Sequence, residues 1–276
     1  MTMTREEQKA HREARRLVAL ARDLTEDEKD TVAEHWQESS SVTNKLDGAH
    51  FTPLGLASDL RFHVVGTRII DLCAGVGRLA YAARELYTRR WEGLPPREIV
   101  CVEKNPDYVA VGRKLMPEAR WIVADVLTMD AEELGLGEFD TAIANPPFGP
   151  RVERHGAGPR YRGDRFEFHV IDRAATLARQ GAFIIPQQSA PFEHSGRPLF
   201  QHRPSEQYAR FHRETGLTLG ENIGIDTSYH GYRWRGVSPT VEIVTADFTD
   251  PASGLLPAPR SAFRGSPAPA SDENVV

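Results

Sequence analysis

The chain has 276 residues, of which 40% are hydrophobic and 26% are charged, and its formal net charge is −5 at pH 7. These values are typical of a globular protein with room for one large α/β domain. They exclude a protein that coats nucleic acid through a globally basic surface, so any contact with nucleic acid must be local.

The composition also argues against membrane, metal and disulfide-stabilised classes. No apolar run reaches the roughly 20 residues that span a bilayer, and the N-terminus lacks the apolar core of a signal peptide. Cys73 and Cys101 are the two cysteines, and the ten histidines show no paired ligand spacing. We therefore expect a cytoplasmic protein without a metal, in which both cysteines are small packing residues.

The first part of the chain predicts a helical arm. Residues 5–22 place small and apolar side chains at helical spacing. Thr25 followed by Glu28 has the pattern of a capping box, which opens a second helix extending to about Glu38. We expect residues 1–46 to be an arm and linker packed on the main domain; the alternative is an arm that binds a partner or forms a dimer.

From Phe51 onward, predicted strands alternate with predicted helices. The strands are 68–72, 98–102, 120–124, 140–144, 182–185 and 240–246; the helices are 53–62, 78–88, 106–115, 166–179 and 205–215, the fourth of which is expected to stop at Gly181. This alternation predicts a doubly wound, mostly parallel sheet that binds ligands at the carboxyl ends of its strands. Residues 47–249 are assigned to this domain, and the proline-rich residues 250–276 to a disordered tail.

A glycine-containing turn follows the first predicted strand. The segment from Asp71 to Gly77 reads DLCAGVG, and Gly75, Gly77 and Ala80 fit the pattern G-x-G-x-x-A. Glycines let a backbone approach a ligand closely, and a helix N-terminus offers unpaired N–H groups. The turn alone favours a nucleoside cofactor, with a plain tight turn as the alternative.

Two acids follow the next two predicted strands. Glu103 ends the second strand, where a carboxylate can accept hydrogen bonds from two ribose hydroxyls. Asp125 follows the third strand, where it can accept from an adenine amino group. Together with the glycine turn, these acids favour S-adenosylmethionine, whose amino group would lie near Asp71.

The segment Asn145-Pro146-Pro147-Phe148 follows the fourth predicted strand. Two adjacent prolines cannot continue a central strand or enter a helix interior, so the chain leaves the sheet stiff and extended. An amide, a proline carbonyl and an aromatic ring are thereby held in fixed relation, which suits binding a planar amine. The alternative is a rigid turn with Phe148 in the core.

In order, these segments resemble the class I methyltransferases that methylate the amino group of adenine in DNA. The resemblance also includes Phe51-Thr52-Pro53-Leu54-Gly55-Leu56-Ala57, upstream of the glycine turn as in the gamma arrangement, and it spans about residues 50–248. It implies a Rossmann-like, mostly parallel sheet of seven strands, with S-adenosylmethionine as cofactor and DNA as substrate. The implied cofactor residues are Phe51, Thr52, Pro53, Asp71, Cys73, Ala74, Gly75, Gly77, Glu103, Asp125, Val126 and Asn145, and the implied catalytic residues are Asn145, Pro146, Pro147 and Phe148.

The chemistry explains why these residue types are needed. The lone pair of an adenine amine is delocalised into the ring, so it must be localised before it can attack a methyl group. We expect the side-chain oxygen of Asn145 and the carbonyl of Pro146 to accept the two N–H bonds of the amine. Phe148 would stack on the flipped base, while Pro147 supplies stiffness.

Two basic and aromatic segments are candidate contacts for nucleic acid. The first is a loop expected to be flexible, with Arg151, Arg154, Arg160, Tyr161, Arg162 and Arg165; the second runs from 229 to 235 and includes Tyr232, Arg233, Trp234 and Arg235. A solvated loop is the alternative for the first, and packing of Tyr232 and Trp234 for the second.

Other functions remain open at this stage. The same chemistry could act on RNA or on a protein glutamine, whereas a nicotinamide dehydrogenase would leave Asn145–Phe148 unexplained. A binding module without catalysis is a further alternative. Little chain separates Phe148 from the predicted tail, so the sequence lacks room for a separate target-recognition domain. This departure from the family favours a small orphan enzyme of a bacterium or phage over strict sequence specificity in restriction–modification.

Overall fold

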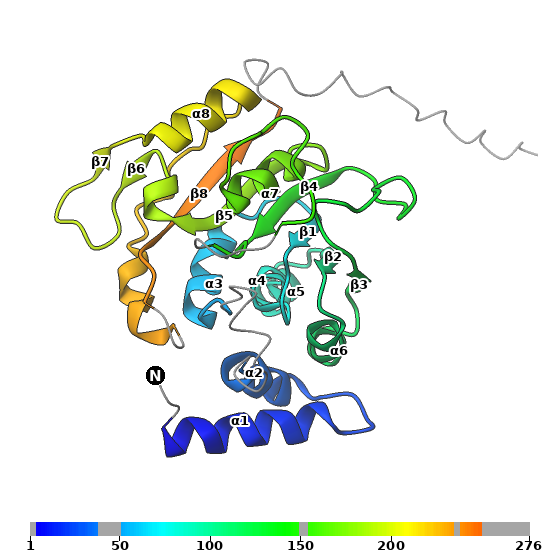
Figure 1. The fold of residues 1–276 in the computed structure, drawn as a ribbon. Coiled ribbons are helices and arrows are strands. Elements are labelled where there is room, and N and C mark those ends of the chain that lie inside the picture. Colours follow the sequence, from blue (N-terminus) through cyan, green and yellow to red (C-terminus); the bar gives the residue numbers. More distant parts are fainter. Residues whose placement is uncertain (1–3, 38–50, 149–153, 235–237, 250–276) are drawn as a thin grey trace, which may run out of the picture.

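A six-stranded sheet forms the centre of the computed structural model, which describes residues 4–37, 51–148, 154–234 and 238–249 (Figure 1). The strand order is β3-β2-β1-β4-β5-β8. The strands are β1 Arg68–Leu72, β2 Glu98–Glu103, β3 Arg120–Val123, β4 Phe139–Ala144, β5 Ala178–Pro186 and β8 Val241–Asp247. Neighbours among the first five are parallel, and β8 is antiparallel to β5. The small pair β6 Phe192–Glu193 and β7 Gln201–His202 lies outside this sheet.

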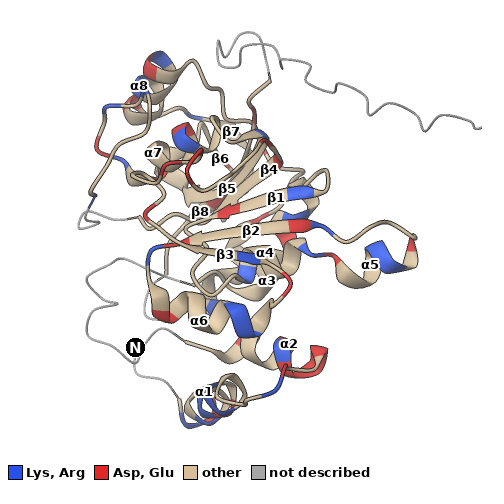
Figure 2. Cartoon of the chain, turned by 90° about the vertical axis from the view of Figure 1, so that its right-hand side faces the viewer, with Lys and Arg blue, Asp and Glu red and all other residues tan. Residues whose placement is uncertain are grey.

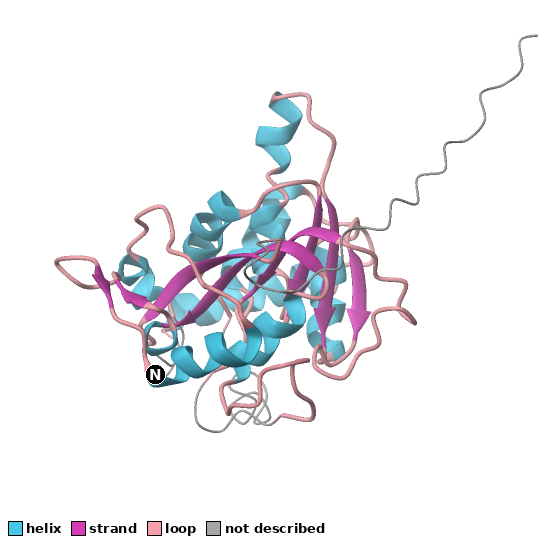
Figure 3. Cartoon of the chain, turned by 90° about the horizontal axis from the view of Figure 1, so that it is seen from above, coloured by secondary structure: helices cyan, strands magenta, loops and turns pink. Residues whose placement is uncertain are grey.

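Helices cover both faces of the sheet, as Figure 3 shows. The α-helices are α1 Arg5–Val18, α2 Glu26–His35, α3 Leu54–Leu60, α4 Arg78–Ala83, α5 Leu86–Trp91, α6 Pro106–Leu115, α7 Phe166–Ala174 and α8 Glu206–Thr215; the 3₁₀ helices are η2 Arg61–His63, η3 Gln187–Ser189 and η4 Thr227–Arg233. Successive strand residues face opposite sides, so Ile69 packs with α3, α4 and α6, while Ile70 packs with α7 and α8. The predicted doubly wound, mostly parallel architecture is confirmed.

Within the described ranges the sheet has six strands, which corrects the seven implied by the resemblance. On the far side of β8 from β5, the chain makes one antiparallel bridge, between Gly220 and Thr245. The side chain of Asn222 then accepts hydrogen bonds from the N–H groups of Gly224 and Ile225. These bonds form a turn, and the side-chain nitrogen of Asn222 also donates to the carbonyl of Ile243 in β8 at 3.2 Å.

The prediction that residues 166–179 form a helix stopped by Gly181 is wrong. Helix α7 ends at Ala174, and Gly181 lies within β5, where it pairs with Ala246. A Cβ at this position would lie 2.3 Å from the ring of Phe183 and 2.9 Å from the ring of Phe248. The glycine therefore makes room for buried aromatic rings in the sheet.

The predicted helix 78–88 is also interrupted. Glu85 has a φ of 44°, which ends α4 and starts α5 in a new direction. In Figure 2, α5 projects beyond the body of the domain. A glutamate in the left-handed region is uncommon, and helical periodicity in the sequence does not reveal it.

The N-terminal helices pack against the domain on the side of α4 and α6. Thr25 and Glu28 form the predicted capping box, although α2 ends at His35 instead of Glu38. Glu26 pairs with Arg84 at 3.0 Å, and the Tyr81 hydroxyl donates to Asp30 at 2.6 Å. The predicted linker after Glu38 and the predicted tail from residue 250 lie outside the described residues.

A glycine in α6 provides a test of this packing. Alanine normally stabilises a helix interior by about 1 kcal/mol relative to glycine. At Gly112, however, a Cβ would lie 2.1 Å from the indole ring of Trp121. We predict that Gly112→Ala lowers the free energy of unfolding by about 1–3 kcal/mol in urea titrations.

Gly231→Ala is the matched control, because no atom lies within 4 Å of its added Cβ. It should change the free energy of unfolding by less than about 0.5 kcal/mol. Equal effects of the two substitutions would contradict the packing of α6 on Trp121.

Candidate active site

Parallel pairing brings the candidate residues to one edge of the sheet. Asp71 in β1 is level with Cys101 in β2 and with Ile143 in β4. The turn after β1, Glu103 at the end of β2, and Asn145 directly after β4 therefore share the carboxyl edge of the sheet. Ligands bind at this edge in doubly wound folds.

The glycine turn is tied to Glu103. Gly75 has a φ of 58°, and its N–H donates to one oxygen of the Glu103 carboxylate at 2.8 Å. The N–H of Asn105 donates to the other oxygen, also at 2.8 Å. A Cβ on Gly75 would lie 3.0 Å from the ring of Phe51. Glycine is therefore needed here both for its backbone conformation and for the close approach of the upstream segment.

Two of the acids at this edge, Asp71 and Glu103, are buried. Burial is the main reason why the pKa of each carboxyl is raised, and the nearby charge of Glu103 raises the pKa of Asp71 further. One oxygen of Asp71 accepts from the N–H of Ala80 at 3.1 Å, while the other is buried without a hydrogen-bond partner among the described residues. Two buried carboxyls with raised pKa values would be stabilised by a cationic ligand.

The carboxylate of Asp125 is bonded within its own turn. It lies two residues after β3, and its carboxylate accepts from the N–H of Leu127 at 2.9 Å. This bond forms a turn that holds Asp125 partly exposed beside the buried Val126. Of the other predicted cofactor residues, Cys73 is partly buried with a φ of 63°, and Ala74 is buried in the same turn.

The upstream segment and the Asn145 loop are joined by a side-chain hydrogen bond. The amide nitrogen of Asn145 donates to the hydroxyl of Thr52 at 2.9 Å. A small cavity of about 30 Å³ lies between these residues and the glycine turn, lined in part by Phe51, Thr52, Gly75 and Asn145. The structure thus brings the predicted cofactor turn and the predicted catalytic loop together.

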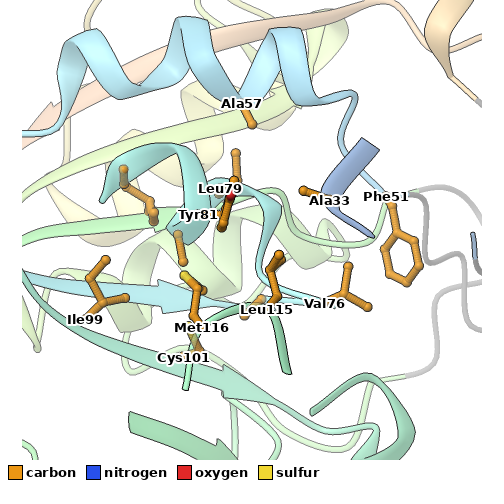
Figure 4. Close-up of a cluster of buried hydrophobic side chains, with 14 of the residues drawn as sticks. Ala33, Phe51, Ala57, Val76, Leu79, Tyr81, Ile99, Cys101, Leu115 and Met116 are labelled. Carbon is orange, nitrogen blue, oxygen red and sulfur yellow. The ribbon is translucent and has the colours of Figure 1, made fainter. Parts of the chain in front are cut away.

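Sequence reasoning missed the residues that support this arrangement. The ring of Phe51 lies 5.5 Å from that of Trp36 and 4.9 Å from that of Tyr108. Arg78 donates to the carbonyl of Thr52 at 3.2 Å and to that of Trp36 at 2.6 Å. Figure 4 shows Phe51 beside Val76 in the buried cluster that includes these elements. Arg78 follows Gly77 directly and was detectable by that position, whereas no local signal connects Trp36 with Phe51.

The other residues of the Asn145 loop pack on the protein. Pro146 is buried, and Pro147 and Phe148 are partly buried. The ring of Phe148 meets that of Trp234 edge-on, with centroids 6.4 Å apart. Phe148 thus lies against the segment just before β8.

The first basic segment differs from the flexible loop that we expected. Arg160 pairs with the buried Asp172 at 2.6 Å, and Arg162 donates to the carbonyls of residues 158 and 159. Tyr161 is fully buried against Phe168. Arg160 and Tyr161 thus hold the described residues 154–165 on α7, while Arg162 bonds within the segment itself. Buried Tyr161 is therefore unsuited to stacking on a base.

The other arginines of that segment have different surroundings. Arg154 donates to the carbonyl of Gly163 at 3.2 Å, and Arg165 is the N-cap residue of α7. Arg151 lies outside the described residues. The sequence showed a run of arginines but could not show that acceptors on α7 and α8 would bind them.

The second segment presents aromatic and cationic groups. Tyr232 is exposed, and the guanidinium of Arg233 lies 5.1 Å from its ring centroid. Arg233 also pairs with Glu34 at 3.1 Å. Trp234 is buried, so of the two predicted aromatic contacts only Tyr232 faces solvent. Arg235 lies outside the described residues.

Comparison with known proteins finds likeness in structure. No protein-family model and no curated protein matches the sequence. A methyltransferase subunit of a type I restriction-modification system from Streptococcus thermophilus has a TM-score of 0.51 and 15% identity, over 80% of this chain and 49% of that chain. This chain shares the fold of that subunit and spans about half of its length.

Two other solved structures have lower scores. A modification subunit of a proposed type I restriction enzyme from Vibrio vulnificus has a TM-score of 0.49 and 14% identity, over 82% of this chain and 50% of that chain. A proposed RNA methyltransferase from Pyrococcus horikoshii has a TM-score of 0.46 and 17% identity, over 86% of this chain and 97% of that chain.

In the described part of the chain, no three histidine, cysteine or acidic residues are clustered so that they could bind a metal ion. No described helix is both long enough and apolar enough to cross a membrane.

The buried His169 predicts a pH dependence of stability. Its Nδ1 accepts from the N–H of Gly158 at 3.0 Å, and its Nε2 lies 2.9 Å from the carbonyl of Gly163, so the neutral ring satisfies both bonds. Burial, reinforced by Arg154, lowers the pKa of His169 to about 4 from 6.5. The unfolded chain therefore binds this proton more tightly, and the stability that His169 contributes is complete above pH 6.5 and lost as pH falls toward 4.

This loss can be isolated with His169→Gln. Between pH 7 and pH 5, the free energy of unfolding in urea should fall more for the unmodified protein than for the variant. Parallel pH profiles would show that His169 is not held neutral by the fold.

Proposed function

We propose that this protein transfers a methyl group from S-adenosylmethionine to the exocyclic amino group of adenine in DNA. The observation that carries the proposal is the 2.9 Å hydrogen bond from Asn145 to Thr52. It joins the loop suited to binding a planar amine with the segment that packs on the glycine turn. A donor site and an acceptor site are thereby adjacent, as a direct transfer requires.

The residues at the sheet edge fit the proposed cofactor. Gly75 and Gly77 have positive φ values and open the turn to a ligand. The buried oxygen of Asp71 that has no partner among the described residues can accept from an ammonium group. The charge of that group would offset the burial that raises the pKa of this carboxyl. Glu103 retains acceptor capacity for ribose hydroxyls beside its two backbone bonds. Asp125 is the acceptor proposed for the adenine amine of the cofactor, and Val126 lines that side.

When bound, S-adenosylmethionine supplies an electrophilic methyl group on a positively charged sulfur. Asn145 and Pro146 then orient the acceptor amine by accepting its two N–H bonds, which directs the nitrogen lone pair out of the ring plane. Phe148 stacks on the base that has left its helix. Because the donor would already be activated, the residues need only position the amine and stabilise the positive charge that develops on it. The methylated amine then loses one proton to solvent water, which restores its neutral form.

DNA is proposed as the substrate for two reasons. The Phe51-Thr52-Pro53 segment precedes the glycine turn, as in the adenine-methylating DNA enzymes that the sequence resembles. The Streptococcus subunit with the same fold is named for restriction–modification.

Asn145→Ala tests the catalytic role. It removes one of the two proposed acceptors, so methyl transfer to DNA should fall by at least about 100-fold. Titration calorimetry with S-adenosylhomocysteine should show that cofactor binding is largely retained, because the glycine turn and the three acids Asp71, Glu103 and Asp125 remain. Near-normal transfer by a folded variant would contradict the mechanism.

Trp36→Ala tests the support given by the N-terminal helices. The indole of Trp36 packs on Phe51, which in turn lies against Gly75. Its loss should weaken cofactor affinity by roughly tenfold, which corresponds to about 1.4 kcal/mol. The matched control is Trp91→Ala, since Trp91 is almost fully exposed on α5. Equal calorimetric affinities for the two variants would show that the arm does not support the site.

A further inference from the structure

A groove of about 420 Å³ lies next to the candidate active site. It is bounded by the end of α2, the start of α3 and the 3₁₀ helix η4. The lining residues that matter here are Glu34, Pro53, Arg78, Tyr229, Tyr232 and Arg233. The chemistry described above leaves this groove without a role.

Two tyrosines give the groove an aromatic wall. In a 3₁₀ helix, side chains three residues apart lie on the same face, and Tyr229 and Tyr232 have this spacing within η4. They are 76% and 78% exposed. Exposed aromatic rings are costly to hydrate, and aromatic rings beside a groove are typical of surfaces on which planar ligands stack.

The wall is firmly attached to the domain. His230, between the two tyrosines, lies 2.6 Å from the carboxylate of Asp59 in α3. Gly55 makes this approach possible, since a Cβ there would lie 2.7 Å from the His230 ring. The tyrosines are therefore presented by an anchored helix, so little ordering would be needed to bind a ligand.

The groove borders the active site. Arg78 lines both the groove and the small cavity beside Asn145. Pro53 follows Thr52, to which Asn145 donates, and Trp234 at the end of η4 contacts Phe148. A polymer whose reacting group lies at Asn145 would have its neighbouring unit within reach of the tyrosines.

The groove holds an ion pair that offers both donors and acceptors to a base. Arg233 is paired with Glu34 at 3.1 Å, so a carboxylate already offsets its charge. Glu34 can accept from ring or amino N–H groups, and Arg233 can donate to ring nitrogens or carbonyls. Both therefore match the edge of a nucleobase that stacks on the tyrosines.

We propose that this groove binds one unpaired base of the substrate strand, adjacent to the adenine that enters the active site. This inference rests on the proposed function for the identity of the strand. It implies that the enzyme acts on single-stranded or locally opened DNA, because a paired neighbour could not present its face to the tyrosines.

The test uses fluorescence anisotropy with a short, labelled single-stranded DNA that contains one adenine. The double variant Tyr229→Ala, Tyr232→Ala should bind about tenfold or more weakly. The conservative pair Tyr229→Phe, Tyr232→Phe should bind like the unmodified protein, since the rings remain. Tyr87→Ala should also bind normally, because Tyr87 is comparably exposed but lies on α5.

A second probe lacks the bases on either side of the adenine. The unmodified protein should bind it about as weakly as the alanine pair binds the intact strand, and the alanine pair should lose nothing further. Unchanged binding by the alanine pair, an equal loss with Tyr87→Ala, or equally tight binding of a fully paired duplex would each overturn the proposal.

Methyl transfer, measured separately, distinguishes this proposal from the proposed function. Transfer without any dependence of DNA binding on the tyrosines would refute the groove alone. Tyrosine-dependent DNA binding without transfer would refute the methyltransferase function and leave the groove. Absence of DNA binding by the unmodified protein would refute both.

Discussion

The hydrogen bond between Asn145 and Thr52 connects segments that are 93 residues apart in the chain. One partner follows the central strand β4, and the other precedes α3. In this bond the nitrogen of the Asn145 amide is turned toward Thr52. The position of the upstream segment therefore bears on how the side chain of Asn145, with its proposed acceptor oxygen, is held at the sheet edge.

That position is itself held from three sides. Arg78 binds the carbonyl of Thr52 and also that of Trp36, so a single buried guanidinium links the start of α4, the upstream segment and the end of the N-terminal arm. Phe51 lies between the indole of Trp36 and the ring of Tyr108, and it rests on Gly75. The arm is thus part of the support for the proposed cofactor site.

The sequence predicted the parts of the fold that depend on local pattern. Strand β1 and helix α6 have the expected bounds, since a buried apolar run and a proline in the first helical turn are strong local signals. The misplaced end of α7 shows the limit of such signals. Gly181 had the position of a helix stop, but its role is to admit Phe183 and Phe248 into the sheet, which is a tertiary requirement.

The candidate site was predictable to a similar degree. Parallel strand ends place the glycine turn, Glu103 and Asn145 at one edge, and motif order alone could indicate that. The burial of individual aromatic side chains, in contrast, could not be predicted from the sequence. Of the aromatic residues expected to contact nucleic acid, Tyr161 and Trp234 are buried, while Tyr232 is exposed together with Tyr229. Composition cannot distinguish these cases, because each aromatic lies among similar arginines.

The most direct test of the central claim is transfer of a labelled methyl group from S-adenosylmethionine to single-stranded DNA, duplex DNA, RNA and protein, followed by digestion and nucleoside or amino-acid analysis. We expect the label in DNA, on the exocyclic nitrogen of adenine. Label found in RNA, on a protein glutamine or at another DNA position, or no transfer to any of these substrates, would contradict the assignment.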